Sequence, residues 1–181
     1  MATVNLLPNA DVSNNWSLSI GSDAYVLVDD DHTAFITTDS SCLSATAAGK
    51  NCILELQDFT ESYSSIDGVQ VVVRAGNNGR GKTFKIKTKL TNEGTPATLY
   101  YEEDSSTQAA SASYRTITFT NRTTSNGSDA WTNAQLNNLR LYVELEAHSG
   151  GTSRFTYCYA IVTYTEPVAV TDNSIFFGSN F

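Results

Sequence analysis

The sequence predicts an all-β protein, a single antiparallel β-sandwich of the jelly-roll-like type. Short segments of alternating apolar and polar residues recur along the chain, separated by turn residues, as in sandwiches and barrels. Nine Tyr and eight Phe, together with many Val, Ile and Thr, favour strands. No window carries a sustained helical repeat of apolar residues.

The expected strands follow one another with no internal repeat or linker between them. The clearest is the last but one, where apolar residues alternate with polar ones, the pattern of a half-buried strand. Its apolar face holds Leu139, Leu141, Val143 and Leu145, and its polar face holds Arg140, Tyr142, Glu144 and Glu146. The segment 69–74 is apolar on both faces, which predicts a central strand covered on two sides. The full set is 24–28, 34–38, 52–56, 69–74, 83–90, 97–101, 114–120, 139–147 and 154–165.

Turn chemistry separates these strands. The glycines of 76–81 permit positive φ and predict a hairpin or a longer loop, and 125–128 and 149–152 are similar. Residues 131–138 predict one or two helical turns, for which Thr132 is a candidate N-cap. Residues 62–67 are a second candidate turn.

The chain of 181 residues suits one domain that buries a core without metal or disulfide support. We expect the sandwich to occupy residues 1–166, because Pro167 closes the last strand. Residues 167–181 then form a C-terminal extended arm. The arm either docks on a partner or folds back on its own sandwich. Its partner-binding candidates are Ile175, Phe176, Phe177 and Phe181.

A net charge of −8 argues against nucleic-acid binding, since phosphates would be repelled. Lys85, Lys87 and Lys89 are a local exception and fall on one face of the strand 83–90. They form either a solvated outer face that protects a sheet edge or a patch that docks on an acidic partner.

Residues that could carry chemistry do not converge on an active site, so we expect no enzyme, no cofactor and no metal. The acidic run of Asp29, Asp30 and Asp31 lacks the spacing of a calcium loop, and adjacent strand residues point to opposite faces. His32 beside it has no nucleophile motif to serve. The carboxylates of 102–104 are expected to be solvated at a strand end.

The three cysteines lack the spacing of a zinc site. Free thiols are the default expectation, although a local disulfide between Cys42 and Cys52 stays open. Trp16 and Trp131 could stack on sugar rings or fill the core, and we favour the core.

Four short segments, in order, resemble β-sandwich structural proteins of tailed-phage virions. They are the Leu6-Leu7-Pro8-Asn9 run followed by Trp16, the Asp29-Asp30-Asp31 segment ending in Phe35-Ile36, the Trp131 segment 131–139, and the strand 155–164. The resemblance implies a head decoration (cement) protein or a tail- or fibre-associated component. Such a protein would be made in the host cytoplasm and built into the virion. It would contact major capsid or tail proteins, and we expect a homo-oligomer.

The alternative function is a carbohydrate-binding β-sandwich module that recognises a surface glycan. The start of the chain lacks the basic and apolar regions of a signal peptide, and we expect no association with membranes.

Overall fold

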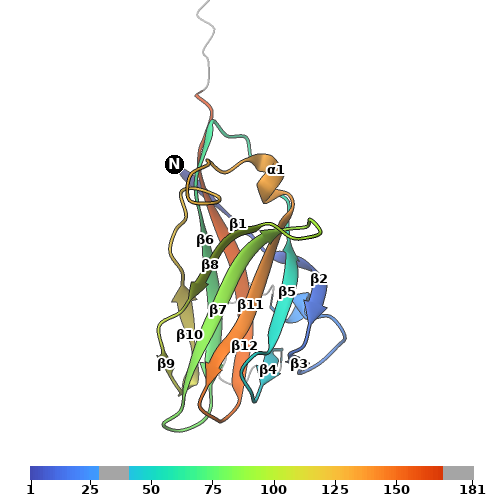
Figure 1. The fold of residues 1–181 in the computed structure, drawn as a ribbon, viewed down its shortest axis with the longest axis vertical. Coiled ribbons are helices and arrows are strands. Elements are labelled where there is room, and N and C mark those ends of the chain that lie inside the picture. Colours follow the sequence, from blue (N-terminus) through green and yellow to red (C-terminus); the bar gives the residue numbers. More distant parts are fainter. Residues whose placement is uncertain (29–40, 169–181) are drawn as a thin grey trace, which may run out of the picture.

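Two six-stranded antiparallel sheets pack face to face in the protein, as Figure 1 shows. The structure, a computed structural model, describes residues 1–28 and 41–168. The predicted all-β antiparallel sandwich with short helical turns is therefore confirmed. Within the described ranges, no helix has the length and apolar character needed to cross a membrane.

Fourteen elements make up the described chain, and most of them are strands. In order they are β1 (Ala2–Leu6), β2 (Pro8–Asn14), β3 (Ser17–Leu18), the 3-10 helix η1 (Tyr25–Leu27), β4 (Leu43–Ala45), β5 (Asn51–Leu56), β6 (Ser65–Asn77), β7 (Thr83–Asn92), β8 (Leu99–Asp104), β9 (Gln108–Ala109), β10 (Ser111–Thr118), α1 (Asn133–Leu136), β11 (Leu139–His148) and β12 (Ser153–Thr165).

The two sheets are interleaved along the sequence. Sheet A has the order β10-β6-β12-β4-β3, with β1 also paired to β12. Sheet B has the order β2-β5-β11-β7-β8, with β9 also paired to β7. Among the described strands, only the connections β3–β4, β7–β8 and β8–β9 stay within one sheet, and every other connection between successive strands crosses to the other sheet, so neither sheet is a continuous piece of sequence.

The core fills the space between the sheets with the inward residues of both. Strands β5, β7 and β11 show the strict alternation that predicts one buried face. Leu54, Ile86 and Leu141 are fully buried from sheet B, and Val71 and Val162 from sheet A. Burying each such side chain contributes roughly 1.5–3 kcal/mol, so the core is the main source of stability.

Strand β6 is central, as its apolar sequence predicts. It lies between β10 and β12, and Val72 on its outer face is only 3% exposed.

The end of the sandwich near α1 is closed by aromatic residues around Trp131, which confirms the predicted place of this residue in the core. Trp131 is 3% exposed, and its indole Nε1 donates to the carbonyl of Arg122 at 2.8 Å. The ring of Tyr100 meets it edge-on, with centroids 5.4 Å apart. Thr132 caps α1: its hydroxyl accepts from the Gln135 amide, and the Gln135 side chain accepts from the Thr132 amide.

Two local predictions are wrong. The predicted strand 24–28 forms instead the 3-10 helix η1, because the Asp11 carboxylate accepts the backbone amides of Ala24 and Tyr25 at 2.6 and 2.7 Å. Residues 62–67 form no helical turn, since β6 already begins at Ser65. For 76–81 the prediction left a hairpin or a longer loop open, and the structure has the loop, because the chain leaves β6 of sheet A at Asn77 and enters β7 of sheet B.

Several predicted features lie outside the described residues. They are the strand 34–38, the acidic run with His32, and the arm residues Ile175, Phe176, Phe177 and Phe181.

Candidate functional site

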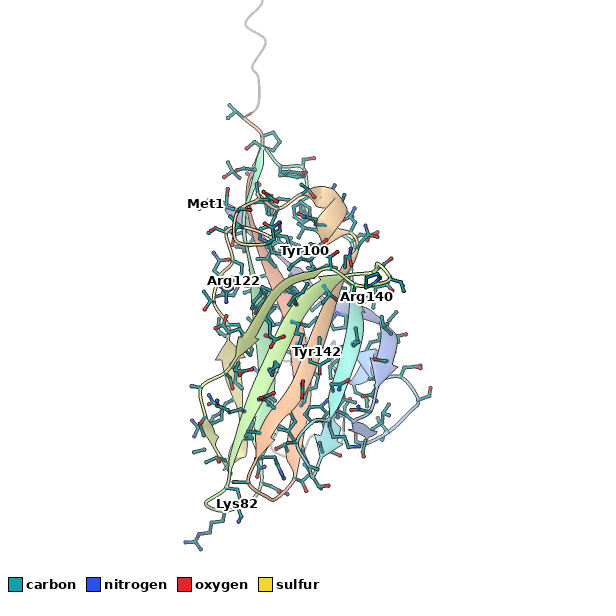
Figure 2. All side chains as sticks on the ribbon, in the orientation of Figure 1. Met1, Lys82, Tyr100, Arg122, Arg140 and Tyr142 are labelled. Carbon is teal, nitrogen blue, oxygen red and sulfur yellow. The ribbon has the colours of Figure 1, made fainter. Side chains whose placement is uncertain are left out.

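The outer face of sheet B carries a row of functional side chains on β11. Arg140, Tyr142 and Glu144 point outward because Leu141 and Val143 between them are fully buried. Figure 2 labels Arg140 and Tyr142 along this strand, at the middle of the sheet. We call the surface formed by Lys87, Lys89, Glu102, Arg140, Tyr142 and Glu144 the Tyr142 face.

Tyr142 is held in place on both its hydroxyl and its ring. Its hydroxyl donates to Glu144 Oε2 at 2.5 Å. The Lys89 ammonium lies over the ring, 5.1 Å from its centroid, in a cation–π arrangement. Desolvation first, and the Glu144 carboxylate second, raise the pKa of Tyr142 well above its usual value, so the phenol stays neutral. A ring fixed in this way loses little conformational freedom when a ligand contacts it.

A network of lysines and carboxylates surrounds this tyrosine. Lys87 Nζ lies 2.7 Å from Glu146 Oε2 and within 4 Å of Glu102 and Asp104. Lys89 Nζ lies 2.7 Å from Glu102 Oε2. The hydrogen bond with Glu146 raises the pKa of Lys87, and the hydrogen bond from Lys89 lowers the pKa of Glu102. Lys87 and Glu102 therefore stay charged at neutral pH.

Arg140 keeps donor capacity that the protein does not use. Its guanidinium Nη1 reaches the Glu93 carbonyl only at 3.5 Å, and its buried Nε has no hydrogen-bond partner among the described residues. The buried Nε is out of reach of a surface ligand, but the long Nη1 contact is weak and leaves the terminal guanidinium N–H groups little used by the protein. Arg140 therefore brings these donors to the same face of β11 as Tyr142.

The predicted lysine row is confirmed as a row, but its setting differs from the expectation. Lys85, Lys87 and Lys89 share one face of β7. That strand is not an edge, because β11 and β8 flank it. Two of the three lysines are already paired with carboxylates of their own chain. Docking of this row on an acidic partner stays a prediction.

The carboxylates of 102–104 lie at the end of strand β8, as predicted, and Glu102 and Asp104 are exposed there. The prediction missed that Glu102 and Asp104 also face the lysines of β7. Glu103 points to the other sheet, and its carboxylate accepts from the Thr120 hydroxyl and Arg122 Nη2, both at 2.9 Å. Glu103 therefore ties the edge of sheet B to the segment after β10.

The remaining sequence candidates belong to the core. Trp16 is 3% exposed and packs on Phe155, so neither tryptophan offers a free ring. Cys42, Cys52 and Cys158 are buried and none of them is in a disulfide, which answers the open disulfide question. Burial raises the pKa of the Cys52 thiol well above its usual value, so it is unreactive. Across the described residues, no cluster of His, Cys, Asp and Glu is suited to a metal ion.

Acidification should lower the stability of this protein through the Tyr142 face. The folded-state pKa of Glu102 lies below its ordinary value of 4.5. Its ion pair therefore stabilises the fold above that value, and the contribution is lost as pH falls through the lower folded-state pKa. The urea concentration at the midpoint of unfolding should be lower at pH 3 than at pH 7, and Glu102→Gln should make this difference smaller.

Asp58→Asn, at an exposed position outside the network, is the control. If both variants lose the same amount of stability between pH 7 and pH 3, the prediction is contradicted.

Comparisons with known proteins reveal only loose structural likenesses. No family model and no curated protein matches the sequence. A truncated AlyQ with CBM32 and alginate lyase domains is similar at 16% identity and a TM-score of 0.48, over 92% of this chain. This chain spans only 34% of that protein.

Two smaller solved structures are similar over nearly their whole length. The xylan-binding module CBM15 has 12% identity and a TM-score of 0.42, covering 92% of this chain and 99% of its own. The CBM36-1 domain of a multidomain xylanase from the hindgut metagenome of Trinervitermes trinervoides has 11% identity and a TM-score of 0.40, covering 76% of this chain and 90% of its own. Likenesses at this level assign no function to the chain.

Proposed function

We propose that the protein is a carbohydrate-binding β-sandwich module, without catalytic activity, that holds a glycan on the Tyr142 face. The observation that carries this proposal is an aromatic ring, fixed by Glu144 and Lys89, in the middle of a mostly polar sheet face.

A sugar needs two kinds of contact, and this face offers both. The C–H faces of a pyranose are apolar and pack on an aromatic ring, while its hydroxyls need donors and acceptors at fixed positions. Tyr142 supplies the ring, and the terminal guanidinium of Arg140 supplies donors. Carboxylate oxygens of Glu102 and Glu144 retain lone pairs beyond those used by their partners, so they accept hydroxyl protons.

The same groups argue for binding without hydrolysis. A glycosidase needs a carboxylic acid whose pKa is raised, so that it can protonate the leaving oxygen. On this face the shift has the opposite sign, because Lys89 lowers the pKa of Glu102. Glu144 and Glu146 are each engaged by a tyrosine or a lysine.

Affinity electrophoresis in gels that contain one soluble polysaccharide each tests this proposal. A shallow face with one aromatic ring predicts weak binding, with a Kd of about 0.1–1 mM, or about −4 to −5.5 kcal/mol. The protein should be retarded in at least one gel, and free sugar should reverse the retardation. Unchanged mobility in every gel, supported by flat calorimetric titrations, would contradict the proposal.

As a second candidate, we propose a structural role in a tailed-phage virion, through the arm 167–181. The specific observation is where the chain leaves the fold. Strand β12 ends at Thr165, and Val168 after it is 87% exposed. The sequence resemblance to virion sandwiches supports this role. A glycan-binding fibre component would combine both candidates.

Truncation after Pro167 should separate folding from assembly. If the arm docks on a partner, the shortened protein keeps its Tm and loses self-association or binding to virion proteins. Differential scanning calorimetry and analytical ultracentrifugation measure the two properties. A Tm lowered by many degrees, with assembly of the folded fraction intact, would show instead that the arm belongs to its own core.

A further inference from the structure

We infer that the glycan bound at the Tyr142 face is a neutral, hydroxyl-rich polysaccharide and not an acidic one. This inference rests on the proposed function and adds the chemical class of the ligand. It follows from the charges of the face, from the partners those charges already have, and from the order of side chains across the strands.

The charge balance of the outer face of sheet B does not favour an anion. Its outward cations are fewer than its outward carboxylates. The cations are Lys85, Lys87, Lys89 and Arg140, and the carboxylates are Glu55, Glu102, Asp104, Glu144 and Glu146. Four positive and five negative charges leave the face at −1, on a chain whose net charge is −8. An acidic polysaccharide would therefore be repelled both by the negative charge of this face and by the negative net charge of the whole chain.

The lysines nearest the ring are also occupied. Lys89 is 2.7 Å from Glu102, and Lys87 is 2.7 Å from Glu146. A uronate or sulfate group would have to replace these carboxylates, which would then be left without a cation. The hydroxyl of a neutral sugar can bind without breaking these ion pairs, because it donates to a carboxylate that stays paired with its lysine.

Strand register sets these groups in a row across the sheet. Glu102 of β8 lies opposite Lys89 of β7, which lies opposite Tyr142 of β11. Tyr142 lies opposite Ile53 of β5, and Ile53 opposite Ser13 of β2. With strands about 4.8 Å apart, these five strands span about 19 Å. A chain of sugars lying across the strands would meet a carboxylate, the lysine paired with it, the ring, an apolar side chain and a hydroxyl in turn.

Isothermal titration of the full chain with neutral and acidic polysaccharides tests the inference. The neutral probes are soluble β-glucan, xylan and mannan, and the acidic probe is polygalacturonate. At least one neutral probe should bind, and polygalacturonate should bind at least tenfold more weakly. In 1 M salt the screening length falls to about 3 Å, so the difference in affinity between the neutral and the acidic probe should become smaller, because that difference is electrostatic.

Two results would overturn the inference, and they differ from each other. If polygalacturonate binds as tightly as any neutral probe, and Tyr142→Ala removes that binding, the proposed function stands and the ligand class is wrong. If no probe of either class binds, at low or high salt, the proposed function fails and the inference fails with it.

Discussion

Replacing Trp131 with alanine should lower the free energy of unfolding by about 3–5 kcal/mol, the usual cost of removing a buried tryptophan. Trp131 is 3% exposed, packs against Tyr100 beneath α1, and bonds to the Arg122 carbonyl. Its loss leaves a cavity at one end of the sandwich, and the Arg122 carbonyl then keeps only the Val69 amide as a donor. At about 2–4 °C per kcal/mol for a chain of this size, the Tm should fall by about 6–20 °C.

Calorimetry of wild type, Trp131→Ala and Trp131→Phe checks this prediction. The phenylalanine variant is the matched control, because it keeps most of the apolar contact and loses the indole N–H. It should therefore lie between the other two. Equal Tm values for all three proteins would show that Trp131 does not support the end of the sandwich.

Replacing Tyr142 with alanine should weaken glycan binding by about tenfold or more while the Tm changes little. Stacking on an aromatic ring is worth about 1–3 kcal/mol in the comparable case of nucleic-acid bases. Tyr142 lies on the outer face of β11, so its removal opens no cavity in the core.

Tyr159→Ala is the matched control for this experiment. Tyr159 is also a half-buried tyrosine on a sheet exterior, but it lies on β12 of sheet A beside Tyr157. Affinity gels should show lost retardation for Tyr142→Ala alone. Loss of binding in Tyr159→Ala, with Tyr142→Ala unaffected, would move the site to the other sheet.

The fold was predictable wherever a strand buries one face. Strands β5, β7 and β11 alternate strictly, and their predicted ranges differ from the observed ones by only a few residues. Residues 24–28 alternate equally well, yet they form η1 because Asp11, distant in sequence, supplies its carboxylate to their amides. No local pattern contains that information. The loop 76–81 shows the same limit, since turn residues do not reveal whether a chain returns to its own sheet.

Only part of the candidate site could be predicted from the sequence. The alternation of 139–147 placed Arg140, Tyr142 and Glu144 on an exposed face, and an aromatic residue on a polar face is the signal that could have singled it out. The lysines of β7 were identified, but their carboxylate partners on β8 were not. That pairing depends on strand register, which the sequence alone did not specify. Because of the pairing, the lysines of β7 belong to a network of opposite charges and do not form a basic patch.

Mapping the bound glycan by amide chemical shifts tests the central claim most directly. Isotope-labelled protein titrated with the tightest-binding neutral glycan should show its largest, saturable shifts on β11 and β7 around Tyr142 and Lys89, with smaller shifts on β8 and β5. The amides of β12 around Tyr159 should stay unchanged. Shifts confined to sheet A, or none at any glycan concentration, would contradict binding at the Tyr142 face.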